Sequence, residues 1–569
     1  MANLNVTYEY VGTIEDEESA IAVAIREIME SCDDDFIPPM SYRNSSTADL
    51  NEQTLHSRDI IPYWKQILSQ KNIVAYINDE IVGFLSFRHD YVKDKFLPVV
   101  QNEVINYIST ICIIKKYRGQ HITSHFYDML ENNNDMPEDM ACECVATRTW
   151  NENIAHIGLL QKRGYTLTHT TFEDRDFDGI KYDTVYYCKC PKRRHTLKFS
   201  DKEDGAFKVM VITTGGTIAQ QHDEFDRTVQ QETSSPFKEC IDDIVKRLNE
   251  VGAKKQETHF VDTVLIEELL NKDSSNIVSE DWVVLINKIV AEYDNYKAFV
   301  ITHGTNTLGY TSAALSFALG RLGKPVVLTG SQVSFGEPGS DAQMNLENAI
   351  RIATYNKVDL WGVMVVFGSK IINGTRVKKT TEYDYDAFKA FGAGKLIGTI
   401  GNSVRIDEAE LNVHKSNWKN PAKSRDELEI ANRFDMHIAS FTEFPGMRSD
   451  IFKVLVEGEA NIKGFILRAT GAGDPNVAEV GSIYDNLRDG FEYLRRKKIP
   501  IIVTTQAPDG IASMDINTPG KEARKLGAIP ARDMSMEAMT VKMAWLLGLG
   551  LPYDEIRRRM GEALRGEIK

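Results

Sequence analysis

The 569-residue sequence lacks three features that would each assign it to a distinct class of protein. It has no run of about 18 apolar residues, so we expect no membrane-spanning helix. Its 7 cysteines are too few to hold a chain of this length together as a disulfide scaffold. Its 67 basic residues are outnumbered by 82 acidic ones, which gives a formal net charge of -15. No sustained basic face is therefore available for nucleic acid.

The start of the chain also lacks a recognisable targeting signal. The first residues, MANLNVTYEYVGTIEDEES, contain no basic segment followed by an apolar stretch. We therefore expect a reducing, cytoplasmic location in which the cysteines are thiols. The composition, 42% hydrophobic and 26% charged, is that of a globular protein. At roughly 100–200 residues per domain, the length predicts about three or four folding units.

The character of the sequence changes at residues 191–206. This stretch, PKRRHTLKFSDKEDGA, is charged, lacks apolar periodicity and begins with proline, which is typical of an interdomain linker. The predicted organisation is a domain at 1–190, a linker at 191–206, a large lobe at 207–425 and a smaller lobe at 426–569.

The part that follows this stretch alternates short apolar runs with helical segments. Continuous apolar runs occur at 207–213, 298–302, 325–328 and 363–367, and each is followed by a glycine-containing turn. Buried parallel strands have this pattern. The sequence therefore predicts a doubly wound α/β large lobe and a smaller α/β lobe that starts near Asp435.

Two of these predicted strands end in glycines and hydroxyl residues. TTGGTIA at 213–219 contains Thr217, and ITHGTNT at 301–307 contains Thr305. In an open parallel sheet, ligands bind beyond the carboxyl ends of the strands. Glycines let backbone amides approach a bound oxygen, where they stabilise an oxyanion while a hydroxyl attacks a carbonyl. Threonine needs a base, and Lys379 is the best candidate in the sequence.

These two segments resemble the signatures of the asparaginase/glutaminase family. Four further segments resemble its intracellular, type I branch: YTSAALSFALGRLGKPVVLTGSQ at 310–332, SDAQMNLENAI at 340–350, NGTRVKKTTEYDYDAF at 373–388 and DMSMEAMTVKMAWLLG at 533–548. The resemblance runs from about residue 209 to the C-terminus. It implies that a small-molecule side-chain amide is hydrolysed by acyl transfer through a threonine, without metal or cofactor. It also implies a homodimer or homotetramer formed through the C-terminal half.

The resemblance assigns roles to individual positions. Thr217 corresponds to the first catalytic threonine, Thr305 to the second, and Lys379 to the lysine that activates the second. The substrate's α-amino and α-carboxylate groups would be held by one loop, and a second loop, often from a neighbouring subunit, would complete the pocket. These loops contribute Asp273, Ser274 and Ser275, and Asp474 and Asn476, respectively.

Two positions depart from the family pattern. Asn306 stands where the family has an acid that anchors the substrate ammonium, and a carboxylate's charge-assisted hydrogen bonds are about twice as strong as neutral ones. The loop after Thr217, AQQHDEFDRTVQQETSSPF, has no tyrosine; Phe225 cannot donate a proton, and Thr228 is an alternative hydroxyl. Two hypotheses follow: amide hydrolysis is retained, or this half is an eroded ligand-binding or sensor module.

The first 190 residues combine a hairpin with two strand–helix units. NIVAYINDEIVGFLSF at 72–87 predicts a hairpin that turns at Asn78 and Asp79. STICIIKKYRGQHITSHFYDMLE at 109–131 predicts a strand, a turn and the start of a helix, whose free amides form a ready anion site. TWNENIAHIGLLQKRGYTL at 149–167 predicts a short amphipathic helix that leads into another strand.

Together these segments resemble the GCN5-related N-acetyltransferase (GNAT) family across about residues 5–190. The resemblance implies a GNAT α/β fold, acetyl-CoA as cofactor and an unknown amine as acceptor. The family loop R-G-x-G-x-G has His121 and Thr123 here in place of two glycines. A degenerate acetyltransferase fold that serves as a docking module is the alternative. The expected cofactor-binding residues are Arg118, Gly119, Gln120, His121, Ile122, Thr123 and Asn151.

Two C-x-C pairs, Cys142 with Cys144 and Cys188 with Cys190, could supply four thiolates to zinc. Cysteine is also a common small residue of apolar cores, and this interpretation is favoured, so no metal is expected. The whole chain is thus predicted to fuse an acetyltransferase-like domain to an asparaginase-like amidohydrolase. The fusion suggests that the two share a substrate or pathway.

Overall fold

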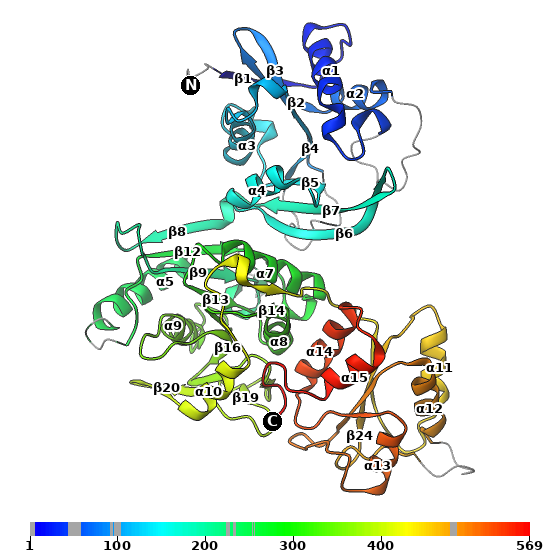
Figure 1. The fold of residues 1–569 in the computed structure, drawn as a ribbon. Coiled ribbons are helices and arrows are strands. Elements are labelled where there is room, and N and C mark those ends of the chain that lie inside the picture. The colour runs from blue at the N-terminus through cyan, green and yellow to red at the C-terminus, as the bar shows by residue number, and fades with distance from the viewer. Residues whose placement is uncertain are drawn as a thin grey trace. The chain divides into compact units, whose positions relative to one another are not determined.

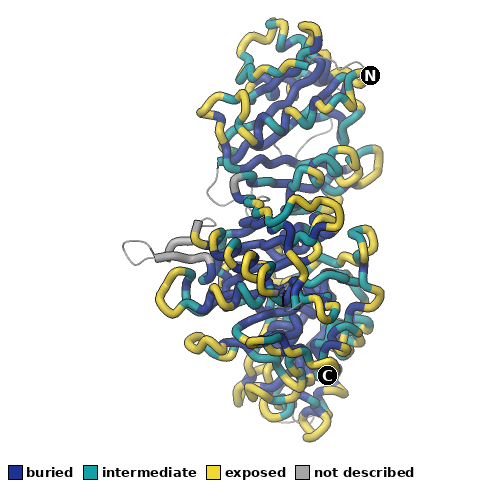
Figure 2. The backbone as a smooth tube through the Cα atoms, turned by 90° about the vertical axis from the view of Figure 1, so that its left-hand side faces the viewer, coloured by how far each residue is buried: buried dark blue, intermediate teal, exposed yellow. Residues whose placement is uncertain are grey.

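A computed structural model describes the chain at residues 6–43, 59–91, 95, 104–222, 228–230, 235–252, 254, 257–477 and 486–569. The chain divides into two compact units, Met1–Arg194 and His195–Lys569 (Figure 1). In both units the strands of the sheets are largely buried while the connecting loops carry most of the exposed residues (Figure 2). Among the described residues, no helix has both the length and the apolarity needed to cross a membrane.

The first unit is a seven-stranded sheet in the order β1-β2-β3-β4-β5-β7-β6. Helices α1 and α2 pack against one face in an apolar core, and α3 and α4 contribute to a second core on the other face. The strands are β1 Val6–Gly12, β2 Lys71–Ile77, β3 Glu80–His89, β4 Ile105–Ile113, β5 Cys144–Trp150, β6 Thr166–Phe177 and β7 Ile180–Lys189. The helices are α1 Ala20–Cys32, α2 Ile61–Leu68, α3 Ile122–Asn132 and α4 Ile154–Lys162.

The predicted hairpin is confirmed as β2 and β3, because Asn78 and Asp79 both have positive φ, as a two-residue hairpin turn requires. Strands β4 and β5 are parallel neighbours, and their pairing extends only from Ile105 opposite Cys144 to Ile108 opposite Thr147. Beyond that point β4 pairs with β3, and β5 pairs with β7. The two parallel strands therefore part in the middle of the sheet.

The second unit has a nine-stranded sheet in the order β21-β20-β17-β16-β15-β13-β9-β12-β8, whose middle strands, from β16 to β12, are parallel. This confirms the predicted α/β layer. The strands are β8 Arg194–Lys198, β9 Lys208–Thr213, β12 Thr263–Glu268, β13 Ala298–Thr302, β15 Pro325–Thr329, β16 Gly362–Phe367, β17 Lys370–Asn373, β20 Gly398–Ile400 and β21 Val404–Ile406. Its helices are α5 Ser235–Arg247, α7 Ser279–Glu292, α8 Leu308–Ala318, α9 Ala342–Ala353 and α10 Glu408–Ser416.

A smaller lobe of the same unit contains the four-stranded parallel sheet β23-β24-β25-β26. Its strands are β23 Ile438–Thr442, β24 Gly464–Ala469, β25 Ile501–Thr505 and β26 Ile529–Pro530. Its helices are α11 Asp450–Glu457, α12 Arg488–Lys497, α13 Thr518–Lys525, α14 Met536–Gly548 and α15 Tyr553–Met560. Short two-stranded pairs complete the unit: β10 Gln220–His222 with β11 Thr228–Gln230, β14 Leu319–Gly320 with β22 Glu429–Ile430, and β18 Val377–Lys379 with β19 Phe388–Ala390.

The structure differs from the linker predicted at 191–206. Strand β8 lies within this stretch and forms the edge of the nine-stranded sheet beside β12. Leu197 and Phe199 alternate along the chain and pack against the core of the second unit. The charged residues between and around them obscure this short period-two pattern in the sequence.

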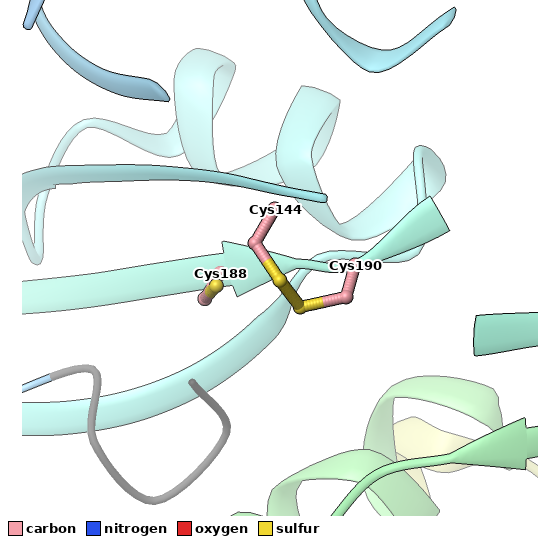
Figure 3. Close-up of side chains that lie close together, drawn as sticks. All are labelled: Cys144, Cys188 and Cys190. Atoms are coloured by element: carbon pink, nitrogen blue, oxygen red, sulfur yellow. A yellow bond between two sulfur atoms is a disulfide. The ribbon is translucent and has the colours of Figure 1, made fainter. Parts of the chain in front are cut away.

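The cysteines also differ from the prediction that all are thiols, because Cys144 and Cys190 form a disulfide (Figure 3). The sulfur of Cys188 lies within 4.8 Å of the other two sulfurs. Cys142 does not join them, since its thiol donates to the carbonyl of Leu130 at 3.6 Å. Cys142 precedes β5 and so does not follow the strand alternation, and the four-thiolate set of the zinc alternative is not assembled.

The disulfide gives a stability prediction for the first unit. It closes a 46-residue separation, and cross-links of this kind typically stabilise a fold by about 2–4 kcal/mol. We expect a reductant to lower the urea midpoint of the first unit, with tryptophan fluorescence as the readout. Cys190→Ser should remove this response to the reductant, whereas Cys240→Ser, which changes a free thiol of the second unit, should retain it. An unchanged midpoint on reduction would contradict the prediction.

Two buried histidines, His303 and His414, and the half-buried His156 predict acid sensitivity. Burial lowers the pKa of His156, His303 and His414 to about 4. In the unfolded chain the same groups take up protons near pH 6.5. Between these two values the unfolded state therefore binds more protons, so the free energy of unfolding falls as the pH drops from about 6.5 to about 4.

Urea titrations at several pH values measure this effect. We expect His414→Gln to make the second unit's free energy of unfolding depend less steeply on pH. The difference in slope should correspond to at most one proton, because the proton of His414 is no longer taken up on unfolding. His437→Gln is the matched control, since the His437 side chain is 51% exposed. Equal slopes for the wild type and His414→Gln would show that His414 does not contribute.

Candidate active sites

The two glycine-rich signatures meet because their strands are neighbours. Strands β9 and β13 pair in parallel with Thr213 opposite Thr302, so the loops after them leave the same edge of the sheet. A Cβ atom at Gly216 would lie 2.4 Å from the Cα of Gly304, and Gly216 also has a φ of +79°. Glycine is therefore required at this contact. Thr217 follows directly and is half-buried.

Lys379, at the end of β18, joins the second signature. Its Nζ donates to Thr305 Oγ1 at 2.9 Å and to Asn306 Oδ1 at 3.0 Å. The Lys379 side chain is only 17% exposed, and Thr305 is buried. Glu382 lies 3.6 Å from the same Nζ, but its side chain is 89% exposed, so solvent screening leaves this ion pair little strength. The neutral amide of Asn306 thus contacts Lys379 without supplying a negative charge.

The Asp273 loop is held against this group by several hydrogen bonds. Asn306 Nδ2 donates to Ser275 Oγ at 3.0 Å, and Thr307 Oγ1 donates to the carbonyl of Ser274 at 2.6 Å. Asp273 accepts from the backbone amide of Ser275 at 2.8 Å. The three residues predicted to hold the substrate therefore lie beside Thr305.

An ion pair that was not predicted from the sequence supports this loop. Lys272 Nζ donates to Asp281 Oδ1 at 2.7 Å, and Asp281 is fully buried. Burial raises the pKa of the Asp281 carboxyl, against the opposing effect of Lys272. The available signal was an acid in the first turn of α7, where its other oxygen accepts from the amide of Val278. Such an acid is common at helix starts, so it did not single out this position.

The predicted second substrate loop lies in the smaller lobe. Asp474 accepts from Asn517 Nδ2 at 2.7 Å, and the backbone amide of Asn476 donates to Glu443 at 2.7 Å. These partners belong to the same lobe, so a role for this loop beside the threonines stays a prediction. Phe225 lies outside the described residues, and for Thr228 the structure describes only the backbone, in β11.

In the first unit, a cavity of about 330 Å³ lies where β4 and β5 part. Arg118 and Thr123 line it, and Gly119 to Ile122 form the turn that begins α3. Gly119 has a φ of +80°, and His121 adopts a left-handed φ of 60°. The turn therefore keeps the backbone geometry of a glycine-rich loop, at a cost of roughly 1–2 kcal/mol for the non-glycine residue.

Arg118 is anchored to the cavity wall. Its guanidinium donates to Asp35 at 2.6 Å, to the carbonyl of Ile113 at 3.0 Å and to the sulfur of Cys32 at 3.5 Å. A hydrogen bond from Cys112, together with Arg118, lowers the pKa of the Cys32 thiol to about 6. No sequence pattern singled out these two cysteines, because they are far apart in the chain.

The structure places Asn151, the asparagine predicted near the cofactor, outside the cavity lining. Asn151 is exposed, is not among the residues that line the cavity, and exchanges hydrogen bonds with the backbone of Asp183. Asn153 does line the cavity; it caps α4 and donates to Thr149 at 3.0 Å. The two asparagines are two positions apart in TWNEN, and only the start of the helix distinguishes them.

Comparisons with known families agree with this architecture. Residues 208–412 match the model "Asparaginase, N-terminal", and residues 437–560 match "Glutaminase/Asparaginase C-terminal domain". Residues 40–165 match the model "Acetyltransferase (GNAT) family".

Curated relatives and a solved structure match the second unit. The L-asparaginase of Thermococcus kodakarensis is 32% identical over 363 residues, which cover 63% of this chain and 99% of that protein. L-asparaginase 1 of Escherichia coli K12 is 32% identical over 296 residues, covering 52% and 82%. A glutamyl-tRNA(Gln) amidotransferase component from Pyrococcus abyssi is 29% identical, covering 66% and 80%. The solved Thermococcus kodakarensis L-asparaginase has a TM-score of 0.52 and 31% identity, covering 64% of this chain and 99% of that chain.

The matches, the adjoining threonine loops and the cavity in the parted sheet lead to the same assignment. The chain is an enzyme of the type I asparaginase family that also carries an N-terminal GNAT acetyltransferase domain.

Proposed function

We propose that the second unit hydrolyses the side-chain amide of L-asparagine or a close relative to the acid and ammonia. The contact of 2.9 Å between Lys379 Nζ and Thr305 Oγ1 carries this proposal. A lysine with a buried stem beside a buried hydroxyl is a suitable partner for proton transfer. Thr217, on the adjoining loop, supplies the second hydroxyl.

The residues support acyl transfer in two steps. One threonine hydroxyl attacks the amide carbon, its proton passes to the departing nitrogen, and ammonia leaves. Water then attacks the ester, one of its protons returns to the threonine oxygen, and the acid is released. Lys379 in its free-amine form accepts the Thr305 proton across their contact and returns it to the leaving group. Backbone amides of the turn at Gly216 would stabilise the negative charge that develops on the amide oxygen.

A substrate panel tests this function. Ammonia release is measured with L-asparagine, D-asparagine, L-glutamine and asparaginyl peptides. We expect L-asparagine or a close relative to give release well above that of the Thr217→Ala and Thr305→Ala chains. No release above these controls for any amide would instead favour the alternative, a binding or sensor module, which the uncharged Asn306 supports.

Asn306→Asp is expected to increase kcat/KM for free asparagine by about tenfold, because a carboxylate holds the substrate ammonium with stronger hydrogen bonds than an amide does. Asn402→Asp adds the same charge in an exposed turn and should leave the activity unchanged. A decrease with Asn306→Asp would mean that the site is adapted to a substrate without a free ammonium group.

We also propose that the first unit transfers the acetyl group of acetyl-CoA to an amine. The first-turn amides of α3 suit the cofactor's pyrophosphate, and the cavity between β4 and β5 suits its thioester arm. Acetyl-CoA supplies an activated acetyl group when bound. Arg118 and Thr123, which line the cavity, would hold it, and Asn153 also lines the cavity.

Two broader proposals concern the whole protein. A homodimer or homotetramer through the C-terminal half would let the Asp474 loop, which Asn517 holds within its own lobe, complete a neighbour's pocket. A cytoplasmic location is favoured because five of the seven cysteines form no disulfide. Sedimentation of the purified chain tests the first proposal, and cell fractionation tests the second.

A further inference from the structure

Three arginines line one end of the cavity in the first unit: Arg43, Arg148 and Arg175. Arg43 and Arg175 are only 9% and 4% exposed. Arg43 donates to the carbonyl of Pro38 at 2.9 and 2.5 Å. Arg175 donates to the carbonyl of Ile37 at 2.6 Å and to Thr184 at 2.8 Å. These hydrogen bonds of Arg43 and Arg175 thus go to neutral oxygens.

Two carboxylates lie close enough to stabilise these arginines, Asp33 near Arg43 and Asp174 near Arg175, but their hydrogen bonds come from other residues. Asp33 accepts from both the amide and the hydroxyl of Ser41, at 2.7 and 2.5 Å. Asp174 accepts from the hydroxyl of Thr184 at 2.7 Å. Among the described lining residues, four arginines face a single aspartate, Asp35, which is paired with Arg118.

Burial and the proximity of the other two arginines lower the pKa of Arg175 to about 9. Three arginines this close together exceed the two nearby carboxylates in charge, and an anion bound beside them would offset the free-energy cost of the excess positive charge. The arginine end of the cavity is therefore suited to an anionic ligand.

Arg43, Arg148 and Arg175 lie on the face of the sheet that α1 and α2 cover, opposite α3 and α4. Arg43 stacks over Tyr63 of α2 at 5.9 Å, and Arg175 lies over Trp150 at 5.8 Å. Arg148 and Trp150 alternate along β5 with Thr147 and Thr149, so the two pairs point to opposite faces. The helices α3 and α4 pack on the other face. The parting of β4 and β5 lets one cavity reach both faces.

We propose that this arginine end binds the carboxylates of a small amino diacid whose amine the first unit acetylates, and that it prefers the acid to the corresponding side-chain amide. The choice of L-aspartate as the probe rests on the amidohydrolase activity proposed for the second unit. Hydrolysis converts a neutral amide into a carboxylate, which is the group that guanidinium forks bind in a bidentate manner.

The transfer step is balanced with acetyl-CoA as the acetyl donor. The neutral amine nitrogen attacks the thioester carbonyl, a C–N bond forms and the C–S bond breaks. The sulfur leaves as a thiolate and takes up the proton that the nitrogen loses. The two units would then act in sequence, with amide hydrolysis first and N-acetylation of its acidic product second.

The preference is tested by acetyl transfer in the full chain carrying Thr305→Ala, so that asparagine is not consumed. We expect kcat/KM for L-aspartate to exceed that for L-asparagine by about 10- to 100-fold, the value of a charged hydrogen-bonded contact. L-Glutamate and an uncharged diamine complete the panel. Equal values for aspartate and asparagine, or preference for the diamine, would overturn the proposal. Because ammonia release is measured separately on the unmodified chain, either proposal can fail alone.

Arginine variants supply a readout beyond turnover. Arg175→Gln should weaken L-aspartate binding in calorimetry without acetyl-CoA by about 10- to 100-fold, while acetyl-CoA binding is retained. Arg26→Gln is the matched control, because it removes one charge from a side chain that is 39% exposed and does not line the cavity. It should change the affinities for L-aspartate and for acetyl-CoA by less than about twofold. Loss of acetyl-CoA binding in folded Arg175→Gln would assign the arginines to the cofactor instead. If Arg175→Gln does not fold, the ratio of kcat/KM for L-aspartate to that for L-asparagine in the Thr305→Ala chain still tests the proposal.

Discussion

Thr305→Ala is expected to reduce ammonia release from the preferred amide by about 10³-fold or more, since removing one member of a catalytic group usually costs this much. The hydroxyl is the partner of Lys379 at 2.9 Å, so its loss leaves the lysine with no proton to transfer. Steady-state ammonia release measures kcat and KM. The loss should be in kcat, because Thr305 participates in the reaction more than in substrate binding.

Lys379→Met and the double variant test whether the two residues act as a unit. Lys379→Met should cause a loss of similar size, and Thr305→Ala with Lys379→Met should lose little more than either single variant. Lys378→Met is the matched control, because its ammonium pairs with Glu537 at 2.9 Å instead of with Thr305. Additive losses would show that Lys379 does not act through Thr305.

Glu567→Gln is expected to lower the free energy of unfolding of the second unit by about 3–5 kcal/mol, because it leaves a buried ammonium without its counter-charge. Lys542 Nζ lies 2.5 Å from Glu567 Oε1, and both side chains are fully buried. Glu567 also accepts from the backbone amides of Leu564 and Arg565, so it holds the segment after α15 against α14.

Urea unfolding of the second unit measures this loss. Glu457→Gln is the matched control, because Lys453 and Glu457 form an exposed ion pair at 3.9 Å, and exposed pairs contribute about 0–1 kcal/mol. If both variants lose equally little free energy of unfolding, the buried pair of Lys542 and Glu567 does not contribute strongly to stability. A large loss limited to Glu567→Gln identifies burial as the cause.

Much of the fold could be predicted from local pattern. The apolar runs that became β9, β13, β15 and β16 and the Asn78-Asp79 turn each depend on neighbouring residues only. Strand β8 was missed because two apolar residues among charges are a weak signal until an edge is available to pair with. That Asn153 and not Asn151 lines the cavity was equally hard to predict, since it depends on where α4 begins.

The sequence by itself determined the two families and the catalytic candidates, because Thr217, Thr305 and Lys379 lie in motifs whose order and residue types are specific. Only the tertiary structure decided that Lys379 contacts both Thr305 and the uncharged Asn306, and that Gly216 must be glycine against Gly304. These are contacts between segments tens of residues apart. A linear pattern does not specify such distances, because they depend on how neighbouring strands align and where their loops meet.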